Sequence, residues 1–598
     1  MSGPRVLEPL LTPWGEELDR DHPLPEYPRP QLARDSYLNL NGLWQCAFRS
    51  TTDEPAVYDG EIVVPFPPES VLSGVGRVLR PDEVLHYRRS FMLPDGFRAN
   101  ADGRVLLQFG AVDQWCRVLV NGHEVAEHEG GSLPFAADVT DVLVPGANEL
   151  RVVVRDPTDT GVLSRGKQVL HPGGIWYTSH SGIWQTVWLE AVPACWVDRL
   201  TITPDLADGS LSVTAHVLGS DSSHASPAVQ VVVSADGDEV TRAVGTVGSP
   251  VRLVLPDPRP WTPEDPFLYD LEVRVGDDVV RSYAGLRSFG VGPDADGHPR
   301  LLLNGEPYLH VGVLDQGYWS DGLVTAPADA ALVLDIATMK DLGFTMLRKH
   351  IKIEPLRWYY HCDRLGMLVW QDLVNGGAPY SNAVVQVPAV LPWRLRDSRY
   401  RTFGRDDEAG RRAWLTEMRD TLTHLHNVVS LAVWVPFNEG WGQFDAAAVA
   451  AEIADLDPTR SVDHASGWHD QGAGDLTSLH VYFRPFRVPR RRRATQHRVL
   501  ALTEYGGYSH RLPDHSVSAR EFGYRRYDSE DELAAAFEKL HERQLLPAVP
   551  RGLGATVYTQ LSDVEDETNG LLTYDRRVLK LPTDLVRRVT GALRAALP

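Results

Sequence analysis

Short strand-like runs fill the first half of the chain. From about residue 37 to 193, runs rich in β-branched and aromatic residues, such as GRVLLQFG and NELRVVVRD, alternate with turns of Gly, Pro, Asn and Asp. This spacing is typical of a β-sandwich or jelly roll, so we predict a jelly-roll domain over 1–193. Further short strands predict an immunoglobulin-like β-sandwich over 194–292, although the Cys…Trp…Cys pattern of antibody domains is absent from the sequence.

The pattern changes after residue 292, where apolar strand-like runs alternate with stretches of helical periodicity. Two helical stretches are clear, one over 327–343 and one over 444–458 that a proline ends. Such alternation indicates a parallel sheet, and eight strands are the number that a (β/α)8 TIM barrel requires, so we predict this barrel over 293–598. The candidate strands are 308–314, 344–350, 367–373, 431–439, 461–467, 476–482, 499–506 and 555–563.

Two carboxylates follow buried strands of this predicted barrel. The segment LHNVVSLAVWVPFNEG is apolar for most of its length and then ends on Asn438 and Glu439, and VLALTEYGG ends its apolar run at Glu504. Barrel strands open into the active-site face at their C-terminal ends, so we expect both glutamates at one mouth. Glycoside cleavage uses such a pair, one carboxyl protonated and the other ionised. A single strand-end glutamate is as often solvated or salt-bridged, whereas two in equivalent positions favour catalysis.

These residues resemble glycoside hydrolase family 2, which includes β-galactosidases, β-glucuronidases and β-mannosidases. Similar segments run along nearly the whole chain, among them GIWYTSHSGIWQTVWLE, CDRLGMLVW and LSDVEDETNGLLTYDRRVLK. The resemblance implies a retaining exo-β-glycosidase, with Glu439 as general acid/base, Glu504 as nucleophile and Asn438 on the substrate 2-hydroxyl. In the acid/base signature, Asn427, Ser430, Trp434, Asn438 and Glu439 are in register, and His426, Val428 and Val435 depart from it.

The resemblance also implies a set of substrate-binding side chains around the two glutamates. Tyr482, at the end of the sixth candidate strand, is similar to the family tyrosine that touches the nucleophile. Asp372, His350, Trp468 and His480 are placed to line the sugar pocket, although a purely structural role is an open alternative.

Three departures from the family affect sugar recognition. The histidine of RKHIKI lies one position early, the first barrel strand ends in GVLDQGYWS, and Thr559 stands near a frequent family tryptophan. The family motif Asn-x-Lys, which binds a glucuronide carboxylate, is absent from the sequence. We therefore favour a β-galactoside, pyranoside or furanoside, over a β-glucuronide, with α-L-arabinoside and β-mannoside as further alternatives.

Two hypotheses of other classes stay open. The chain could be a non-catalytic glycan-binding protein, although the presence of both glutamates and Asn438 argues against this. It could also be a metal-dependent barrel isomerase, which needs a His/Asp/Glu ligand cluster that the strand ends do not provide in the sequence. We expect no required cofactor and no catalytic metal. The acidic run SDVEDE (562–567) leaves a structural divalent cation open.

Composition excludes some partners. The formal net charge of −21 argues against nucleic acid, and we interpret the basic run 484–498, with Arg490–Arg493, as a solvated loop. No signal-peptide core and no run of 18 uncharged apolar residues is present in the sequence, so we expect a cytoplasmic protein without membrane contact. The four cysteines are scattered, which favours buried thiols over a disulfide framework. Homo-oligomerisation is left open.

Two further motifs have weaker implications. GVLSRGK (161–167) has the spacing of a nucleotide-binding P-loop, but Gln168 replaces the required Ser or Thr and no helix follows, so we interpret the match as chance. Tryptophans near predicted loops could stack on sugar faces, and we expect one or two of them to do so. They are Trp319, Trp358, Trp441 and Trp468.

Overall fold

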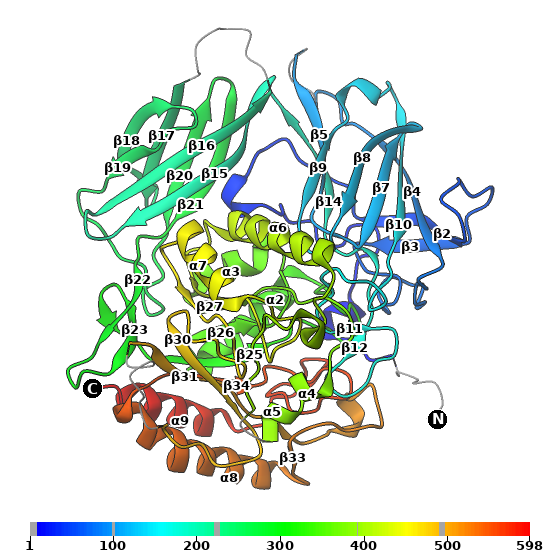
Figure 1. The fold of residues 1–598 in the computed structure, drawn as a ribbon. Helices are drawn as coiled ribbons and strands as arrows, with labels where there is room; N and C mark the ends of the chain where they lie inside the picture. Colours follow the sequence, from blue (N-terminus) through cyan, green and yellow to red (C-terminus); the bar gives the residue numbers. More distant parts are fainter. Residues whose placement is uncertain (1–8, 98–101, 220–227, 391–392, 490–496) are drawn as a thin grey trace.

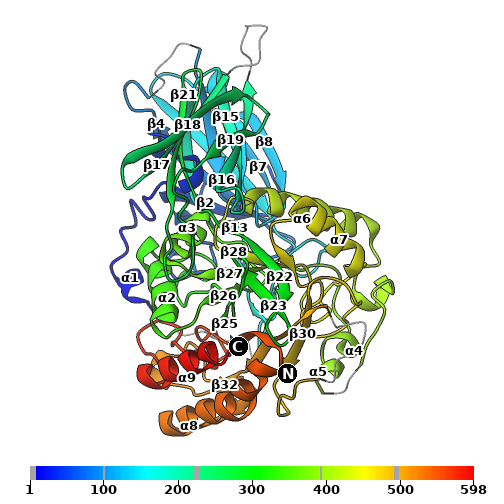
Figure 2. The same ribbon diagram turned by 90° about the vertical axis from the view of Figure 1, so that its left-hand side faces the viewer.

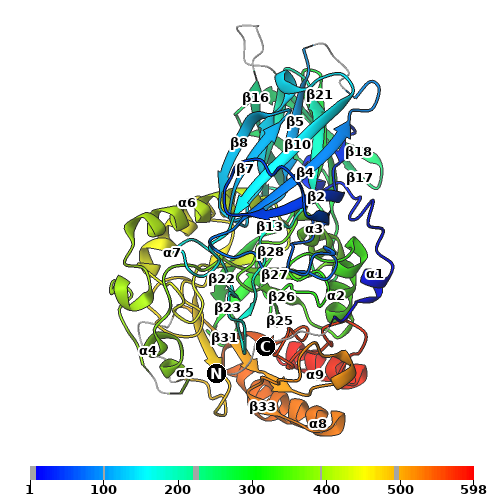
Figure 3. The same ribbon diagram turned by 90° about the vertical axis from the view of Figure 1, so that its right-hand side faces the viewer.

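The computed structural model describes residues 9–97, 102–219, 228–390, 393–489 and 497–598. Two β-domains lie side by side on one side of a barrel, and helices α8 (Glu530–Leu540) and α9 (Thr583–Ala595) cover the opposite side (Figure 1). Figures 2 and 3, turned to either side, give the same arrangement. The predicted fold class, a jelly roll, an immunoglobulin-like sandwich and a TIM barrel, is confirmed.

The N-terminal domain packs a six-stranded sheet, β3-β2-β4-β10-β7-β8, against a four-stranded sheet, β1-β14-β5-β9. Residues alternate along these strands between a buried face and the opposite face, and the buried residues of both sheets form one core. The strands are β1 Leu38–Asn39, β2 Gly42–Arg49, β3 Gly60–Val64, β4 Val84–Met92, β5 Arg104–Phe109, β7 Trp115–Val120, β8 His123–Glu129, β9 Phe135–Asp138, β10 Ala147–Arg155 and β14 Val187–Val192.

The second domain is a sandwich of a three-stranded sheet, β15-β16-β19, and a four-stranded sheet, β18-β17-β20-β21. Strand β20 shows strict alternation of buried and exposed residues, as expected where one face is buried against the other sheet. The strands are β15 Cys195–Asp205, β16 Ser210–Gly219, β17 Ala228–Ala235, β18 Asp238–Thr246, β19 Val251–Val254, β20 Tyr269–Val275 and β21 Asp278–Ala284.

A small sheet connects the sandwich to the barrel. Strand β22 (Phe289–Pro293) pairs with β23 (Pro299–Leu303), which pairs with β24 (Glu306–Pro307). The boundary predicted between 292 and 293 therefore falls inside β22, and the boundary predicted at 193 falls in the short link between β14 and β15. Leu301 of β23 packs in the same hydrophobic cluster as the barrel strands, so this sheet closes the N-terminal end of the barrel.

All eight candidate barrel strands form one parallel sheet in the order β29-β28-β27-β26-β25-β34-β31-β30. Most of these strands, such as β28 and β34, are buried on both faces, which explains the continuous apolar runs of the sequence, whereas β30 alternates buried and partly exposed residues. The strands are β25 His310–Asp315, β26 Met346–Lys349, β27 Leu368–Asp372, β28 Leu431–Val435, β29 Ser461–Val462, β30 Leu476–Val481, β31 Val499–Gly506 and β34 Leu553–Thr559.

The helices of the barrel depart from a regular alternation between β29 and β30. Helices α2 (Asp329–Asp341), α3 (Leu356–Leu365), α6 (Glu408–Leu425) and α7 (Ala446–Leu456) precede the next strands, but a loop over 463–475 joins β29 to β30. This loop has three glycines and His469 at positive φ, which a helix does not accommodate. Strands β29 and β30 stand at the two ends of the sheet order, and side chains connect them: Ser466 Oγ lies 3.1 Å from His480 Nε2.

A helix that crosses a bilayer needs about 20 consecutive, mostly apolar residues. None of the helices, within the described ranges, combines the length and the apolar character of a membrane-spanning segment. The basic run Arg490–Arg493 lies outside the described residues.

Candidate active site

The first glutamate of the site lies four residues beyond the end of β28. The Glu439 N–H donates to the Ser466 carbonyl at 2.9 Å, and the Trp468 indole N–H donates to the Glu439 carbonyl at 2.9 Å. Glu439 adopts a left-handed backbone conformation with φ of 51°, which costs a non-glycine residue about 1–2 kcal/mol. The two hydrogen bonds hold this turn, so the carboxyl group has a fixed place at the barrel mouth.

The second glutamate lies within β31 and contacts a buried arginine. Arg348 of β26 donates from Nη1 to Glu504 Oε1 at 3.2 Å, and the Tyr482 hydroxyl donates to Glu504 Oε2 at 2.5 Å. Arg348 also makes two hydrogen bonds to Asp372, at 2.9 and 3.0 Å. Charge-assisted hydrogen bonds of this kind fix orientation, so Arg348 and Tyr482 together hold the Glu504 carboxylate in place.

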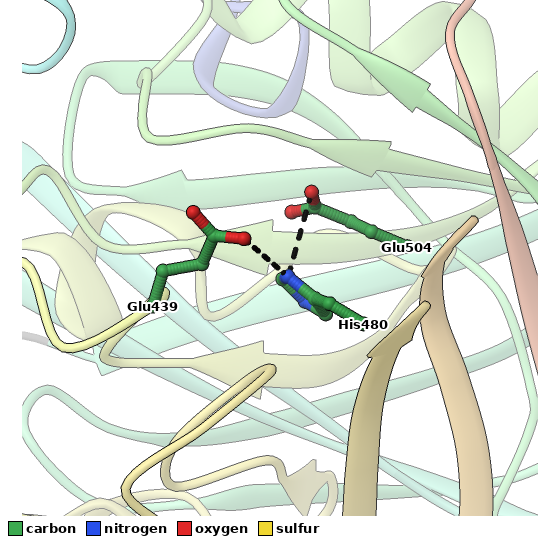
Figure 4. Close-up of side chains that lie close together, drawn as sticks. All are labelled: Glu439, His480 and Glu504. Carbon is green, nitrogen blue, oxygen red and sulfur yellow. Dashed lines mark hydrogen bonds and ion pairs between the residues drawn. The ribbon is translucent and has the colours of Figure 1, made fainter. Parts of the chain in front are cut away.

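A histidine lies between the two glutamates (Figure 4). His480 Nδ1 is 2.7 Å from Glu439 Oε1 and 3.5 Å from Glu504 Oε2. One carboxylate oxygen of each glutamate and a ring nitrogen of His480 all lie within 4.8 Å of one another. The structure therefore brings the two predicted catalytic residues into one small space, joined by a residue that the sequence analysis assigned only to substrate binding.

Burial sets the protonation of the three groups. It raises the pKa of Glu439 to about 8, against the opposing effect of the Lys167 and Arg348 charges. It also raises the pKa of Glu504, which His480, Arg348 and the Tyr482 hydrogen bond lower. Burial lowers the pKa of His480 to about 4, so its imidazole is neutral at pH 7. Because Glu504 accepts hydrogen bonds from Arg348 and Tyr482, we assign the negative charge to Glu504 and the proton to Glu439.

Asn438 presents an unsatisfied donor at this mouth. Its side-chain oxygen accepts a hydrogen bond from Arg348 Nη2 at 2.9 Å, but its side-chain nitrogen has no partner among the described residues. The residue is only 2% exposed. Buried polar groups in native proteins are nearly always hydrogen-bonded, so this N–H is available to a bound ligand.

The other predicted pocket residues lie in the same cluster at different depths. Trp468 places its ring 5.4 Å from the ring of His480, which contacts Glu439. His350 Nδ1 lies 2.7 Å from Asp372 Oδ2, and both residues are buried behind Arg348. Asp372 therefore contacts the arginine that holds Glu504, and His350 contacts Asp372. Contact of either residue with substrate stays a prediction.

The structure adds a residue that the sequence analysis missed. Lys167 belongs to the jelly-roll domain, yet its ammonium lies 3.9 Å from the Glu567 carboxylate and 5.8 Å from the centre of the Trp441 ring. Its charge lowers the pKa of Glu439 and of His350. From its sequence, GVLSRGK resembles only a nucleotide-binding loop. In the structure, this segment brings the Lys167 cation of the jelly roll close to the barrel mouth.

The acidic segment 562–567 holds this jelly-roll loop in place. The Thr178 N–H donates to Glu565 Oε1 at 2.8 Å, and the Tyr177 hydroxyl donates to Glu567 Oε2. Asp563 pairs with Lys580 at 2.6 Å. Glu565 and Glu567 therefore join the jelly roll to the barrel, whereas the Asp563 pair lies within the barrel. The structural divalent cation considered for this run stays untested.

A possible metal-ligand set exists, in contrast to the expectation from the sequence. The sequence analysis found no His/Asp/Glu cluster at the strand ends, whereas Glu439, His480 and Glu504 have three donor atoms close enough to bind one ion. These are also the groups that the glycosidase hypothesis requires. The expectation that no such cluster could be assembled was wrong, because the bend after β28 brings Glu439 towards β30.

The four candidate tryptophans and the cysteines differ in burial. Trp319 and Trp358 are each 1% exposed within the barrel core, and their rings lie against Arg576 and Lys349, which leaves Trp441 and Trp468 as the candidate sugar platforms. Trp441 is also buried but lies beside Lys167 and His350. Three of the cysteines are buried as expected, whereas Cys195 at the start of β15 is partly exposed.

Sequence profiles of one known family match three consecutive parts of the chain. They are described as glycosyl hydrolases family 2, sugar binding domain, over 77–193; glycosyl hydrolases family 2, over 196–289; and glycosyl hydrolases family 2, TIM barrel domain, over 299–497. The chain belongs to glycosyl hydrolase family 2. The matched regions follow the three domains of the structure in order.

Relatives within family 2 have different names. A β-galactosidase of Klebsiella pneumoniae (strain 342) is 27% identical over 419 residues, 65% of this chain and 36% of the relative. A β-glucuronidase of Rattus norvegicus is 26% identical over 408 residues, 64% of this chain and 58% of the relative. These matches span less than two thirds of either relative. The structure of a β-D-glucuronidase of Dictyoglomus thermophilum has a TM-score of 0.71 at 18% identity, covering 96% of this chain and 99% of that one, which shows a shared fold.

Proposed function

We propose that this family 2 member is a retaining exo-β-glycosidase that removes a terminal sugar by double displacement. The observation that carries the proposal is the proximity of Glu439 and Glu504, with one oxygen of each inside a 4.8 Å group. Retaining enzymes place their two carboxyl groups about 5–5.5 Å apart, and inverting enzymes about 6.5–9.5 Å apart. The short separation favours direct attack by a carboxylate over attack by an intervening water.

In the first step, a Glu504 oxygen attacks the anomeric carbon while the leaving oxygen takes the proton of Glu439. In the second, Glu439 removes a proton from water, whose oxygen displaces Glu504 and returns the sugar with its original configuration. The free Asn438 N–H faces this space and suits a sugar 2-hydroxyl. A non-catalytic glycan-binding protein would not need an acid held protonated beside a carboxylate held ionised.

The charges near the pair favour a neutral sugar, and we keep a β-galactoside, pyranoside or furanoside, as the leading substrate. Arg348 is paired with Asp372 and Glu504, and Lys167 faces Glu567. Both cations already have an acidic neighbour, whereas a uronic acid needs an unpaired cation to bind its carboxylate. A β-glucuronide is the second candidate, because Lys167 is a cation close to the mouth and its 3.9 Å ion pair is long. Comparing nitrophenyl β-galactosides, β-galactofuranosides, α-L-arabinosides, β-mannosides and β-glucuronides distinguishes these substrates.

We expect the first product of hydrolysis to be the β-anomer. Proton NMR recorded before mutarotation, on the best nitrophenyl β-glycoside, measures this directly. EDTA is included as a control, because loss of activity on chelation would instead support a metal bound by the Glu439–His480–Glu504 group. Release of the α-anomer would rule out the role of Glu504 as nucleophile.

The pH dependence is expected to identify the acid. Hydrolysis requires protonated Glu439, so kcat/KM should fall as pH rises through about 8. The Lys167 charge stabilises the ionised form of Glu439, so Lys167→Met should raise that pKa and move the alkaline limb to higher pH. The matched control is Lys539→Met, an exposed lysine of α8 far along the chain. An alkaline limb that stays in place, or moves downward, in Lys167→Met would contradict this electrostatic role.

A further inference from the structure

A cleft with a volume of about 670 Å³ lies between the jelly roll, the immunoglobulin-like sandwich and the barrel. It lies between the outer face of the β1-β14-β5-β9 sheet and helix α6, with further walls from Asp198–Leu200 and from 26–32. Figure 1 shows α6 lying across the barrel directly beneath both β-domains. The cleft shares no lining residue with the Glu439–His480–Glu504 group. Its volume is within the range of about 300–1,000 Å³ that is typical of small-molecule sites.

The sheet wall of this cleft carries two side-chain amides, those of Gln108 and Gln185. Gln108 of β5 is 6% exposed and Gln185, shortly before β14, is 8% exposed, and neither side-chain amide has a hydrogen-bond partner within the described residues. Each amide offers two N–H donors and a carbonyl acceptor. Neither amide is among the fully buried polar groups, so the polar atoms of both are accessible from the cleft, where they can bind the hydroxyls of a ligand.

The helix wall is polar along the stripe that faces the sheet. Residues 413, 416, 417, 420, 423, 424 and 427 follow helical spacing and all line the cleft. Thr416, Asp420 and Thr423 on this stripe are exposed, so the two domains do not pack closely here. A domain interface built for stability alone would place apolar residues at these positions.

Ring faces and charge define the class of ligand. His128 and Phe135 stack at 4.2 Å at the edge of the cleft, and both are only partly buried. Among the lining carboxylates, Glu129, Asp198 and Asp420 have no ion-pair partner in the described part of the chain. Arg29 and Arg357 are paired with acids, which leaves Arg199 as the one lining arginine there without an acidic partner. This excess of free carboxylates disfavours anions, and amides, hydroxyls and ring faces together suit a neutral polyhydroxylated ligand.

We propose that this interdomain cleft is a second saccharide-binding site, separate from the catalytic pair. A neutral mono- or disaccharide binds with its hydroxyls on Gln108, Gln185 and Asp420 and an apolar sugar face against the His128–Phe135 stack. Because the cleft is lined by all three domains, the bound sugar also stabilises their arrangement, and a rise in the temperature of unfolding accompanies binding.

Titration calorimetry on the full chain tests this site with a defined set of probes: galactose, glucose, mannose, xylose, arabinose, lactose and cellobiose. We expect at least one to bind saturably and to raise the unfolding temperature. Thr416→Trp, which fills the cleft from an exposed helix position, should weaken this binding by about tenfold or more, because the ring takes the place of the sugar. Arg412→Trp, on the same helix but outside the cleft and 71% exposed, is the matched control.

A second pair of variants separates loss of binding from loss of folding. Gln108→Met keeps the side-chain volume and removes the amide, and Gln45→Met is its control, since Gln45 is an exposed residue of β2 that contacts Arg88. Binding should fall in the first and persist in the second, while hydrolysis of nitrophenyl glycosides stays within about twofold of wild type in both.

The variant Glu504→Gln makes the outcome independent of catalysis. Sugar binding at the cleft should persist in this variant, whatever its hydrolytic rate. The proposal is overturned if no probe binds, if binding is lost in Glu504→Gln but retained in Thr416→Trp, or if inorganic phosphate or glucuronate competes more strongly than any neutral sugar. Binding without any hydrolytic activity would leave the cleft in place and refute only the proposed enzyme.

Discussion

Replacing Glu504 with glutamine is expected to lower kcat by about 10⁴-fold or more, because the substitution removes the nucleophile of both chemical steps. Glutamine has nearly the same shape, so the hydrogen bond with Tyr482 and the place beside Arg348 are preserved in outline. The measurement is single-turnover and steady-state hydrolysis of an activated nitrophenyl glycoside, for which leaving-group protonation is not limiting. Loss of rate would then report the nucleophile alone.

A variant that leaves a cavity in place of the Glu504 carboxylate provides a second test of the nucleophile. Glu504→Ala opens a cavity beside Tyr482, and a small anion such as formate or azide is expected to restore turnover of the activated glycoside. Tyr482→Phe is the matched control: it removes the hydrogen bond to Glu504 but leaves the carboxylate, so we expect a smaller loss and no rescue. Activity of Glu504→Gln within about tenfold of wild type, with the fold intact by circular dichroism, would contradict the assignment.

The barrel was predictable because its strands are buried on both faces. Such strands appear in the sequence as continuous apolar runs. The run that leads to Glu504 falls within the residues of β31. Asn438 and Glu439 were predicted at the mouth for the same reason, although β28 itself ends at Val435. The missing helix between β29 and β30 was not predicted, because the positive φ of its glycines and of His469 follows from contacts made in the folded loop.

Other parts of the site could not be predicted from local sequence patterns. Lys167 lies more than 250 residues before the glutamates, in a loop whose position depends on Glu565 and Glu567 of the barrel. Arg348 was visible within RKHIKI, but its contacts with Asp372 and Glu504 join β26 to the adjacent β27 and, across the barrel, to β31. The proposed catalytic pair follows from strand periodicity, whereas the surrounding charges follow from how the domains dock.

The division of the site between barrel and jelly-roll residues bears on substrate specificity. The groups to which we assign the chemistry belong to the barrel, but Lys167 and Trp176 come from the jelly roll, with the Trp176 ring 5.0 Å from that of Trp441. Loops vary more readily than barrel strands, so a loop from another domain can change the sugar or leaving group without altering Glu439 or Glu504. We therefore expect substrate preference to respond to this loop more than to the barrel strands.

The acid/base role of Glu439 predicts an effect that depends on the leaving group. Glu439→Ala should lower kcat/KM for an alkyl β-glycoside by about 10²–10⁴-fold, and much less for a dinitrophenyl glycoside, because a good leaving group needs little protonation. The ratio kcat/KM is the right quantity, since it reports formation of the glycosyl-enzyme. By contrast, kcat also includes hydrolysis of that intermediate, for which Glu439 serves as base.

The matched control is Asn438→Ala, one position away. Asn438 carries a free N–H suited to a sugar hydroxyl and no acid, so its loss should lower kcat/KM by a similar factor for both leaving groups. The alkaline limb near pH 8 should vanish in Glu439→Ala with the dinitrophenyl substrate and persist in Asn438→Ala, because burial of Glu439 is what places that pKa. Equal losses for alkyl and dinitrophenyl glycosides in Glu439→Ala would show that this residue binds the sugar and does not protonate the leaving oxygen.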